Sequence, residues 1–139
     1  MNTYVLNFKG YWLDSNRNNI PAVSGIYMVY RGIYNSVNNK VKLNEILYIG
    51  QANNLQERHK NHDKRELFLK ECNKSLNETL CYTIAEVSQK DLDIVENALI
   101  YIQKPKLNDK NKESFNFFMS RFIFNGNCLL LNDNDVILR

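Results

Sequence analysis

The chain has 139 residues, which is the size of one domain and leaves little room for a second. Hydrophobic residues make up 44% and charged residues 24% of it, an ordinary globular composition that excludes global disorder. The net charge of +3 permits binding to a polyanion but is too small to indicate it. Any nucleic-acid surface must therefore come from local clustering of charge.

Three cysteines, Cys72, Cys81 and Cys128, form no CxxC pair, and their odd number argues against a disulfide framework. The first nine residues lack a long apolar run, so no signal peptide is visible. No stretch approaches the ~20 apolar residues that a membrane helix needs. We therefore expect a cytoplasmic protein without a membrane contact.

The first third of the chain reads mainly as strands. Residues 4–8 alternate weakly between apolar and polar, as a short strand would, and residues 12–21 are polar and loop-like. Residues 25–30 and 46–49 are rich in aromatic and β-branched side chains and predict two further strands. The Asn-rich residues 35–39 between them are turn-like, so these two strands are expected to form a long β-hairpin.

Helices follow this hairpin. Asn54 and Glu57 resemble a capping box, which predicts a helix over residues 55–62 and beyond. A second helical piece is expected over residues 65–72, and residues 80–87 predict a third strand.

A clear amphipathic helix comes next. Ser88 and Asp91 repeat the capping pattern at its start, and Pro105 lies just beyond its end. Its apolar stripe contains four residues: Leu92, Val95, Leu99 and Ile102. Glu96 belongs to the edge of this stripe, where a half-buried carboxylate is costly unless it is paired or bound to a metal.

The tail predicts strands again. Residues 119–124 and 128–131 flank the Asn-Gly dipeptide at 125–126, which predicts a β-hairpin with a type I′ turn, and residues 136–138 could add a strand. The order strand, strand, helix, helix, strand, helix and hairpin favours a single α+β domain (1–139), with a largely antiparallel sheet flanked by helices.

Six side chains on these elements together suit the hydrolysis of a phosphodiester bond: Tyr27, Tyr48, Arg58, His62, Glu96 and Asn108. Glu96 offers a hard carboxylate for one Mg²⁺ or Mn²⁺ ion. Arg58 can clamp phosphate oxygens and stabilise the extra charge of the transition state. Tyr27 and Tyr48 supply hydroxyls, one of which could orient or deprotonate a water if nearby cations lowered its pKa.

Each of these side chains also has a simpler explanation. A strand tyrosine is usually a half-buried aromatic residue, and a helix glutamate is usually solvated. Arg58 and His62 are four residues apart and are expected to share one helix face, with His59 pointing away from it. The spacing of His59, His62 and Cys72 matches no closed zinc site. Only the joint occurrence of the six residues favours catalysis.

These residues and their spacing resemble the GIY-YIG nuclease family over residues 22–110. The match includes Gly25-Ile26-Tyr27, Tyr48-Ile49-Gly50 and then, in order, Arg58, His62, Glu96 and Asn108. The spacing and the tail predict an inserted hairpin loop at residues 31–45 and a C-terminal β-hairpin extension at residues 111–139. The resemblance implies a small central antiparallel sheet of three strands flanked by helices. It also implies a metal-dependent DNA endonuclease with one divalent ion held by Glu96.

The same resemblance implies roles for the other residues of the set. Tyr27 or His62 would lie near the attacking water, and Tyr48 would lie at the phosphate. Arg58 would act on the transition state, and Asn108 would make a structural or a phosphate contact.

Two features depart from the family pattern. Twenty residues separate Tyr27 from Tyr48, more than the family commonly has between its tripeptides, so the hairpin must carry an insertion. A second Gly-Ile-Tyr, at residues 32–34, lies closer to the usual spacing. We assign the motif to Tyr27, because residues 25–30 make a proper strand, whereas Tyr34 runs straight into the Asn-rich turn.

Five basic residues near these candidates are expected to contact DNA phosphates: Lys60, Lys64, Arg65, Lys104 and Lys106. Such contacts position a duplex but read no sequence. Many family members carry a separate targeting domain, which is not recognisable here, so a homodimer and a separate targeting subunit are both open. The rival function is a catalytically silent module of the same fold that binds nucleic acid or a partner protein.

Overall fold

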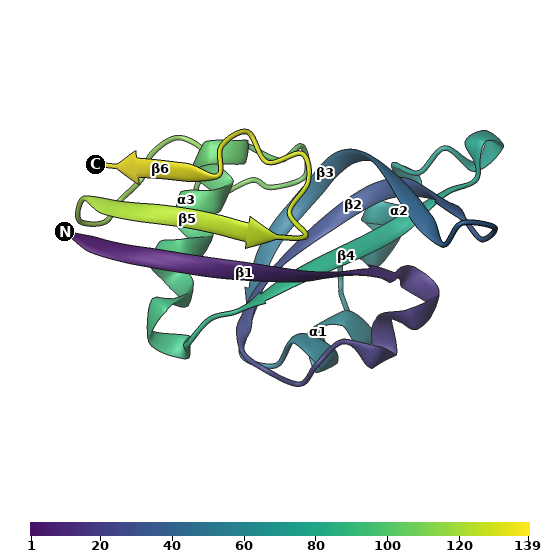
Figure 1. The fold of residues 1–139 in the computed structure, drawn as a ribbon, viewed down its shortest axis with the longest axis horizontal. Helices are drawn as coiled ribbons and strands as arrows, with labels where there is room; N and C mark the ends of the chain where they lie inside the picture. Colours follow the sequence, from purple (N-terminus) through teal and green to yellow (C-terminus); the bar gives the residue numbers. More distant parts are fainter.

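The computed structural model describes residues 1–139 and contains one sheet of six strands in the order β3-β2-β4-β1-β5-β6 (Figure 1). The strands are β1 (Asn2–Leu13), β2 (Gly25–Asn35), β3 (Lys40–Ala52), β4 (Glu78–Glu86), β5 (Ser120–Gly126) and β6 (Asp135–Leu138). The α-helices are α1 (Leu55–Lys60), α2 (Arg65–Lys70) and α3 (Leu92–Gln103), and the 3-10 helices are η1 (Asp14–Asn19), η2 (Lys74–Leu76) and η3 (Gln89–Asp91). The mixed α+β content is confirmed, but the expected sheet of three strands is wrong, because both ends of the chain add strands to it.

β1 is the largest of these additions. It pairs antiparallel with β4 and parallel with β5, where Leu6 lies beside Phe124. Leu6 and Phe8 are buried, while their neighbours in the strand are exposed. The strand runs on to Leu13 and is followed by η1, so the loop expected over residues 12–21 is wrong in its first part. Because the polar residues of β1 face solvent, the apolar pattern in the sequence covered only part of the strand and predicted it too short.

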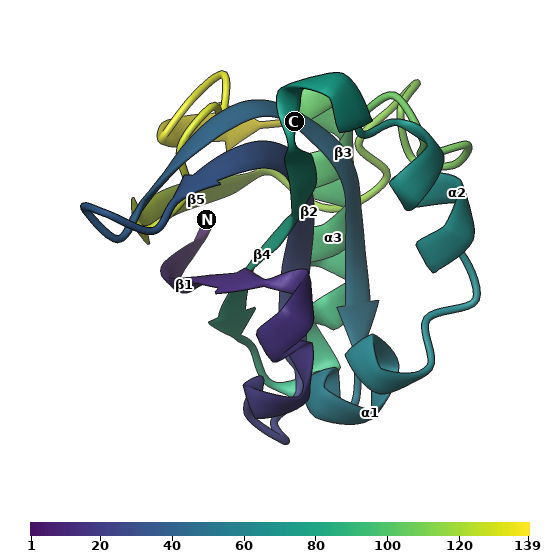
Figure 2. The same cartoon turned by 90° about the vertical axis from the view of Figure 1, so that its right-hand side faces the viewer.

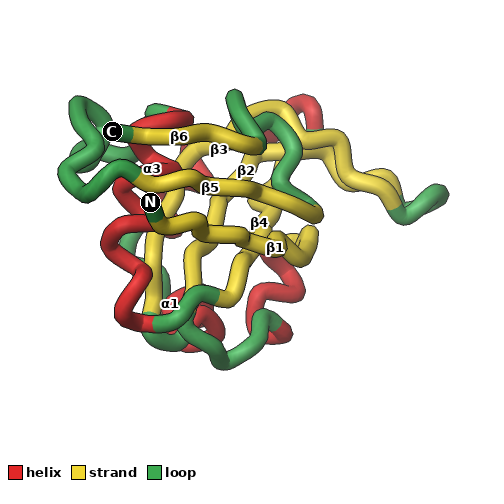
Figure 3. Tube along the Cα trace, turned by 60° about the vertical axis from the view of Figure 1, so that its left-hand side comes forward, coloured by secondary structure: helices red, strands yellow, loops and turns green.

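β2 and β3 form the expected long β-hairpin. Their register runs from Gly25 beside Ala52 to Asn35 beside Lys40. Ile33 is the last residue of β2 that pairs with β4, so the end of the hairpin leaves the sheet and projects from the body of the molecule (Figure 3). We call residues 31–45 the arm.

The side chains of β2 alternate between two cores on opposite faces of the sheet. Met28 and Tyr30 belong to the larger core, which α3 covers, whereas Tyr27 and Val29 belong to the smaller core on the side of α1 and α2 (Figure 2). The apolar stripe of α3 is buried as expected, apart from the half-buried Ile102. None of the helices is both long and apolar enough to cross a lipid bilayer.

The C-terminal hairpin forms, but with a different partner strand from the expected one. β5 continues through Gly126, and the returning strand β6 begins only at Asp135, so the expected strand over residues 128–131 is wrong. The backbone N–H of Asn127 donates to the carbonyl of Phe8 at 3.0 Å. The chain after β5 therefore closes first on β1, and the expected type I′ turn is absent. The expected last strand is confirmed as β6.

Candidate active site

Tyr27 and Tyr48 lie on neighbouring strands, and their rings meet on the side of the sheet that carries α1 and α2. The register pairs Tyr27 with Gly50 and Val29 with Tyr48, and the ring centroids of the two tyrosines are 6.2 Å apart. Tyr27 is fully buried, whereas Tyr48 is half-buried. The competing motif tyrosine, Tyr34, lies in the arm and pairs with the far end of β3. This register favours Tyr27 over Tyr34 as the partner of Tyr48.

The glycines of the two tripeptides, Gly25 and Gly50, lie where neighbouring atoms pack too closely for a side chain. A Cβ atom on Gly50 would lie 2.4 Å from Cζ and Oη of Tyr27. A Cβ atom on Gly25 would lie 2.1 Å from the carbonyl oxygen of Ala85. Both positions must lack a side chain so that the Tyr27 ring and β4 can approach the backbone closely.

Two side chains donate hydrogen bonds to the Tyr27 hydroxyl. The backbone N–H of Lys64 donates to Nδ1 of His62 at 3.1 Å, so a neutral His62 ring carries its proton on Nε2. Nε2 of His62 lies 2.7 Å from Oη of Tyr27 and donates to it. Nε of Arg58 donates to the same oxygen at 3.4 Å. Both lone pairs of the Tyr27 hydroxyl are thereby engaged, which fixes the phenol in place.

His62 reaches Tyr27 from a loop and not from a helix. The Asn54 cap is confirmed, because its side chain accepts from the backbone N–H of Glu57 at 3.1 Å. The prediction that this helix runs past His62 is wrong, because α1 ends at Lys60 and His62 lies in the loop between α1 and α2. Arg58 and His62 therefore do not share a helix face, and their meeting at Tyr27 depends on the path of this link.

Burial controls the ionisation of the site. It raises the pKa of Tyr27, and the hydrogen bond and charge of Arg58 only partly oppose this effect. Burial and the charge of Arg58 lower the pKa of His62 to about 4. At neutral pH both Tyr27 and His62 are therefore uncharged, and the positive charge of the cluster belongs to Arg58.

Glu96 lies on α3, at the edge of the sheet where β3 ends. Nε2 of Gln51 donates to Oε1 of Glu96 at 3.1 Å and to Oδ1 of Asp93 at 2.8 Å. Burial raises the pKa of Glu96, the negative charge of Asp93 raises it further, and the hydrogen bond of Gln51 and the charge of Arg58 lower it. The Glu96 carboxylate is thus held near like charge in a half-buried place, where a bound cation would be favourable.

A cavity of about 240 Å³ joins Glu96 to the tyrosine cluster. Its lining includes Tyr48, Lys64, Glu96, Asn108, Asp109 and Lys110. No three His, Cys, Asp or Glu side chains gather into a metal-binding group. The residues nevertheless fit a hard divalent ion held by Glu96, the half-buried carboxylate of the lining, since Mg²⁺ keeps several waters and fills its octahedron with substrate phosphate.

Asn108 makes a structural contact. Its Oδ1 accepts from the backbone N–H of Ile49 at 3.0 Å, and its Nδ2 donates to the Ile49 carbonyl at 2.9 Å. The backbone N–H of Leu107 donates to the Leu47 carbonyl at 3.0 Å. The segment after α3 therefore satisfies the open edge of β3 on both sides of Tyr48, and of the two contacts expected for Asn108 the structure contains the structural one.

Comparison with known proteins yields matches among solved structures only. No family model and no curated protein matches the chain. Two crystal structures of the GIY-YIG N-terminal endonuclease domain of UvrC from Thermotoga maritima, both tyrosine-to-phenylalanine mutants bound to the catalytic divalent cation, are similar to it at a TM-score of 0.46. The sequence identities are 19% and 20%, and each match covers 70% of this chain and 96% of the other.

The five cations expected to contact DNA have different surroundings. Arg65 is held in two hydrogen bonds to the buried Asp14, at 3.1 and 2.5 Å, and Lys106 donates to Glu71 at 2.6 Å. Lys104 lies 4.2 Å from the ring centroid of Tyr101.

Lys60 lies 3.9 Å from Glu57, in an exposed pair that is weak in water. Of the five expected cations, only Lys64 lines the cavity beside Glu96, with its Nζ 5.0 Å from the centroid of the Tyr48 ring.

Sequence reasoning missed three residues that hold the site together. Gln51 bridges two carboxylates, and its position directly after Gly50 was the only available signal. His59 is buried with its ring centroid 4.8 Å from that of Tyr27, and its Nδ1–H donates to the Leu55 carbonyl at 2.7 Å. Asp14 anchors α2 from a segment that looked like a solvated loop.

Proposed function

We propose that this chain is an endonuclease of the GIY-YIG type, which hydrolyses DNA phosphodiester bonds with the help of one Mg²⁺ or Mn²⁺ ion. The observation that carries the proposal is the convergence of His62 and Arg58 on the Tyr27 hydroxyl, next to a cavity shared by Tyr48 and Glu96. These five side chains come from β2, β3, the α1 region and α3. A set of residues kept only for packing would have no reason to bring a guanidinium, two phenols and a half-buried carboxylate to one place.

In the proposed reaction, a water oxygen bonds to phosphorus while the bond from phosphorus to the 3′ oxygen breaks. The water loses one proton, and the leaving oxygen gains one. A divalent ion held by Glu96 would supply positive charge for the phosphate oxygens. Arg58 would add to this charge, because its guanidinium is half-exposed and only loosely paired with Asp63, at 3.6 Å.

Exposure divides the tyrosine cluster into two layers. Tyr27 has no exposed surface and the side chain of His62 is only 4% exposed, whereas Tyr48 and Arg58 reach solvent. We therefore assign substrate contact to Tyr48 and Arg58. Tyr27 and His62 act from beneath as positioning residues, because their hydrogen bonds fix the place from which Arg58 extends.

The proposal is tested by cleavage of supercoiled plasmid and of branched oligonucleotide duplexes with Mg²⁺ or Mn²⁺. We expect Glu96→Gln and Arg58→Ala each to lose about a hundredfold or more in rate, with the far-UV circular dichroism of the parent. Matched controls are Glu86→Gln, at an exposed position on β4, and Arg121→Ala, which pairs with Asp135 between β5 and β6. Both controls should cut at the parental rate.

Two other outcomes would count against the proposal. If Glu96→Gln and Arg58→Ala cut as fast as the parent, the site is wrongly assigned. If the parent binds DNA tightly but cuts no substrate with any divalent ion, the chain is a catalytically silent binding module of this fold.

A further inference from the structure

A second hollow lies away from the candidate active site, between the arm and the end of β1. Its volume is about 480 Å³, and its lining includes Tyr11, Trp12, Asn16, Tyr34, Asn39 and Lys40. Figure 1 shows the tip of the arm and the 3-10 helix that follows β1 at the same end of the molecule. We call this site the arm hollow. One wall comes from the insertion that separates the two tripeptides and the other from the end of β1 and η1, and none of its lining residues has a role in the proposed cleavage reaction.

The walls of the arm hollow are aromatic and held in place. Tyr34 is 38% exposed, and its hydroxyl donates to Oδ1 of Asn39 at 2.8 Å. The hydroxyl of Tyr11 accepts from the backbone N–H of Leu129 at 3.0 Å, and its ring packs edge-on against Tyr30. Trp12 is half-buried. Flat rings with fixed orientation suit the stacking of another flat ring.

The charge around the arm hollow favours an anion. The arm between residues 32 and 44 contains Lys40 and Lys42 and no acidic residue. Asp14, which follows the β1 wall in the chain, is buried and neutralised by its hydrogen bonds to Arg65. The exposed amides of Asn16 and Asn39 at the rim offer both donors and acceptors. The ligand that fits is a flat heteroaromatic ring with polar edges attached to a negative group.

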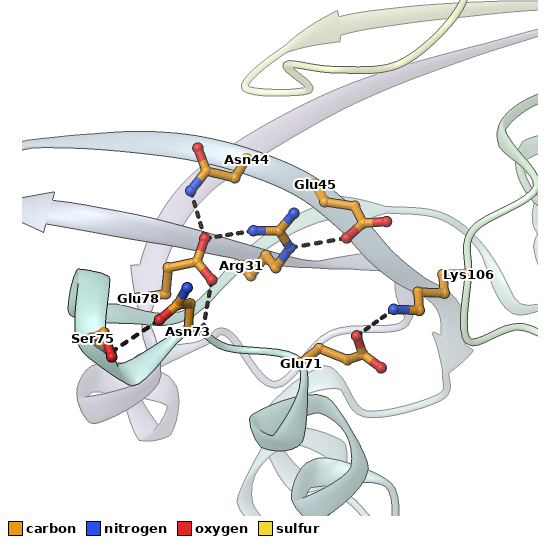
Figure 4. A network of polar contacts seen from close by, with 8 residues as sticks. All are labelled: Arg31, Asn44, Glu45, Glu71, Asn73, Ser75, Glu78 and Lys106. Carbon is orange, nitrogen blue, oxygen red and sulfur yellow. Dashed lines mark hydrogen bonds and ion pairs between the residues drawn. The ribbon is translucent and has the colours of Figure 1, made fainter.

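The arm that carries this wall is fixed at its start (Figure 4). Arg31 donates to Glu45 at 2.9 Å and to Glu78 at 2.6 Å. Glu78, whose side chain has no exposed surface, also accepts from Asn44 at 2.6 Å and from the backbone N–H of Asn73 at 2.7 Å. The arm is thus bound both to itself and to the segment before β4, so its aromatic wall is presented in a set place.

We propose that the arm hollow binds an unpaired nucleobase of the DNA substrate, which stacks on Trp12 and Tyr34 while Lys40 contacts its phosphate. This inference rests on the proposed function, because it takes DNA as the substrate. Tyr48 lies eight positions after Lys40 in β3, which corresponds to at most about 26 Å along the strand. That length spans about eight base pairs of duplex DNA. The chain therefore prefers DNA with single-stranded character within one helical turn of the cut.

The chain contains a single tryptophan, so Trp12 reports directly on its own hollow. We titrate the Glu96→Gln variant, in a buffer with EDTA, with an oligomer of about ten deoxythymidines and follow tryptophan emission. Saturable quenching is expected, and an oligomer of the same length made of abasic sites should quench far less. In a parallel anisotropy titration, Tyr34→Leu and Lys40→Gln should each weaken binding about tenfold.

Two matched controls leave the arm hollow intact. Tyr101→Leu removes a ring on α3, and Lys70→Gln removes an exposed cation at the end of α2; both should bind as the parent does. Absent quenching, equal quenching by the abasic oligomer, or unchanged binding in Tyr34→Leu would overturn the inference. If the parent chain still cuts fully paired DNA when one of these three results is found, the proposed function stands and only the inference about the arm hollow fails. Base-dependent quenching in a chain that cuts no substrate would support the arm hollow as a base-binding site and overturn the proposed cleavage.

Discussion

Gly50 and Tyr27 share one small volume, because a Cβ atom at position 50 would lie 2.4 Å from the Tyr27 hydroxyl. In Gly50→Ala the phenol must move, and its bonds to His62 and Arg58 must lengthen or break. We expect a loss in cleavage rate of about a hundredfold, because Arg58 loses its support at Tyr27 and a displacement of a catalytic group by about 1 Å typically has an effect of this size. The measurement is the rate of plasmid cleavage with Mn²⁺, together with a thermal melt to show that the fold survives.

A double variant tests whether the loss in cleavage rate is caused by displacement of Tyr27. Tyr27→Phe removes the hydroxyl, so adding Gly50→Ala to it should cost much less than Gly50→Ala costs alone. Additive losses would show that Gly50→Ala damages something other than the position of the phenol.

Gln51 holds the Glu96 carboxylate through a hydrogen bond of 3.1 Å and shares its amide with Asp93. Gln51→Met keeps the length of the side chain but removes both bonds, which frees Glu96 to change its rotamer. We expect the affinity for Mn²⁺, measured by calorimetry without DNA, to fall about tenfold, as it does when a partner of a metal ligand is removed. Asn53→Ala, at an exposed site two residues further on, is the control. Equal affinities in the two variants would rule out this role for Gln51.

The residues of the candidate site could be selected from the sequence, but their contacts could not be predicted. Tyr27 and Tyr48 could be paired because a hairpin places residues on neighbouring strands side by side. The bond from His62 to Tyr27 could not be derived, because it depends on where a short loop turns. The burial of Tyr27, on which the proposed substrate contact of Tyr48 rests, depends on packing against α1 and was equally hidden.

The α1 region carries two buried histidines, and this makes the stability of the fold depend on pH. Burial lowers the pKa of both His59 and His62 from the ordinary 6.5 to about 4. Between pH 4 and 6.5 the unfolded chain therefore binds more protons than the folded chain, so the free energy of unfolding rises with pH across this window and falls on acidification. Urea denaturation at pH 4.5, 5.5 and 7 should show a total loss of a few kcal/mol toward the acid end.

Replacement of either histidine should flatten this dependence. His59→Phe keeps a ring against Tyr27 and Tyr82 without a titratable group. His62→Asn keeps a polar side chain at the other position. A pH profile between 4.5 and 7 that stays as steep in the double variant as in the parent would mean that other groups cause it.

Lys64 and Arg65 are neighbours in the chain, but only Lys64 is expected to contribute to DNA binding. Lys64 lines the cavity beside Glu96, whereas Arg65 is committed to Asp14. We expect Lys64→Gln to reduce the slope of log affinity against log salt concentration by about 0.9, as the loss of one phosphate contact does. Arg65→Gln should leave the slope unchanged and lower the free energy of unfolding by about 2–3 kcal/mol, because the buried Asp14 loses both hydrogen bonds from Arg65 and keeps only the Tyr82 hydroxyl and Arg17 at 3.6 Å.

Fluorescence anisotropy at several salt concentrations and urea denaturation measure these two effects. Arg65→Gln with a reduced slope and full stability would show that the pair with Asp14 opens to admit DNA. The sequence alone could not distinguish the roles of Lys64 and Arg65, because the partner of Arg65 lies 51 positions earlier in the chain.

Some elements with a local signal were predicted correctly, whereas those that depend on distant partners were not. Asn54 caps α1 as its spacing with Glu57 indicated, because that bond joins residues three apart. The course of the chain after β5 was mispredicted because the backbone of Asn127 bonds to Phe8, 119 positions earlier. An Asn-Gly pair favours a tight turn, but a neighbouring strand with a free carbonyl overrode that preference.

At the scale of the whole molecule, the sheet joins the predicted nuclease core to the C-terminal extension. β5 lies between β1 and β6, and it contributes Phe122 and Phe124 to the larger core. That core also contains Val95 and Leu99 of α3, the helix that carries Glu96. The extension therefore supports the same layer that positions the candidate metal ligand.

We accordingly expect that residues 1–110 alone do not fold as a domain, because a chain without residues 111–139 lacks β5, the parallel partner of β1. The fragment should bind a hydrophobic dye and unfold in urea without a cooperative transition. In the full chain, Phe122→Ala should cost about 3–5 kcal/mol, since Phe122 is fully buried. Phe118→Ala, at a side chain that is 91% exposed, should cost almost nothing. A cooperative fragment, together with equal stability of the two variants, would show instead that the extension is an accessory to a core that folds alone.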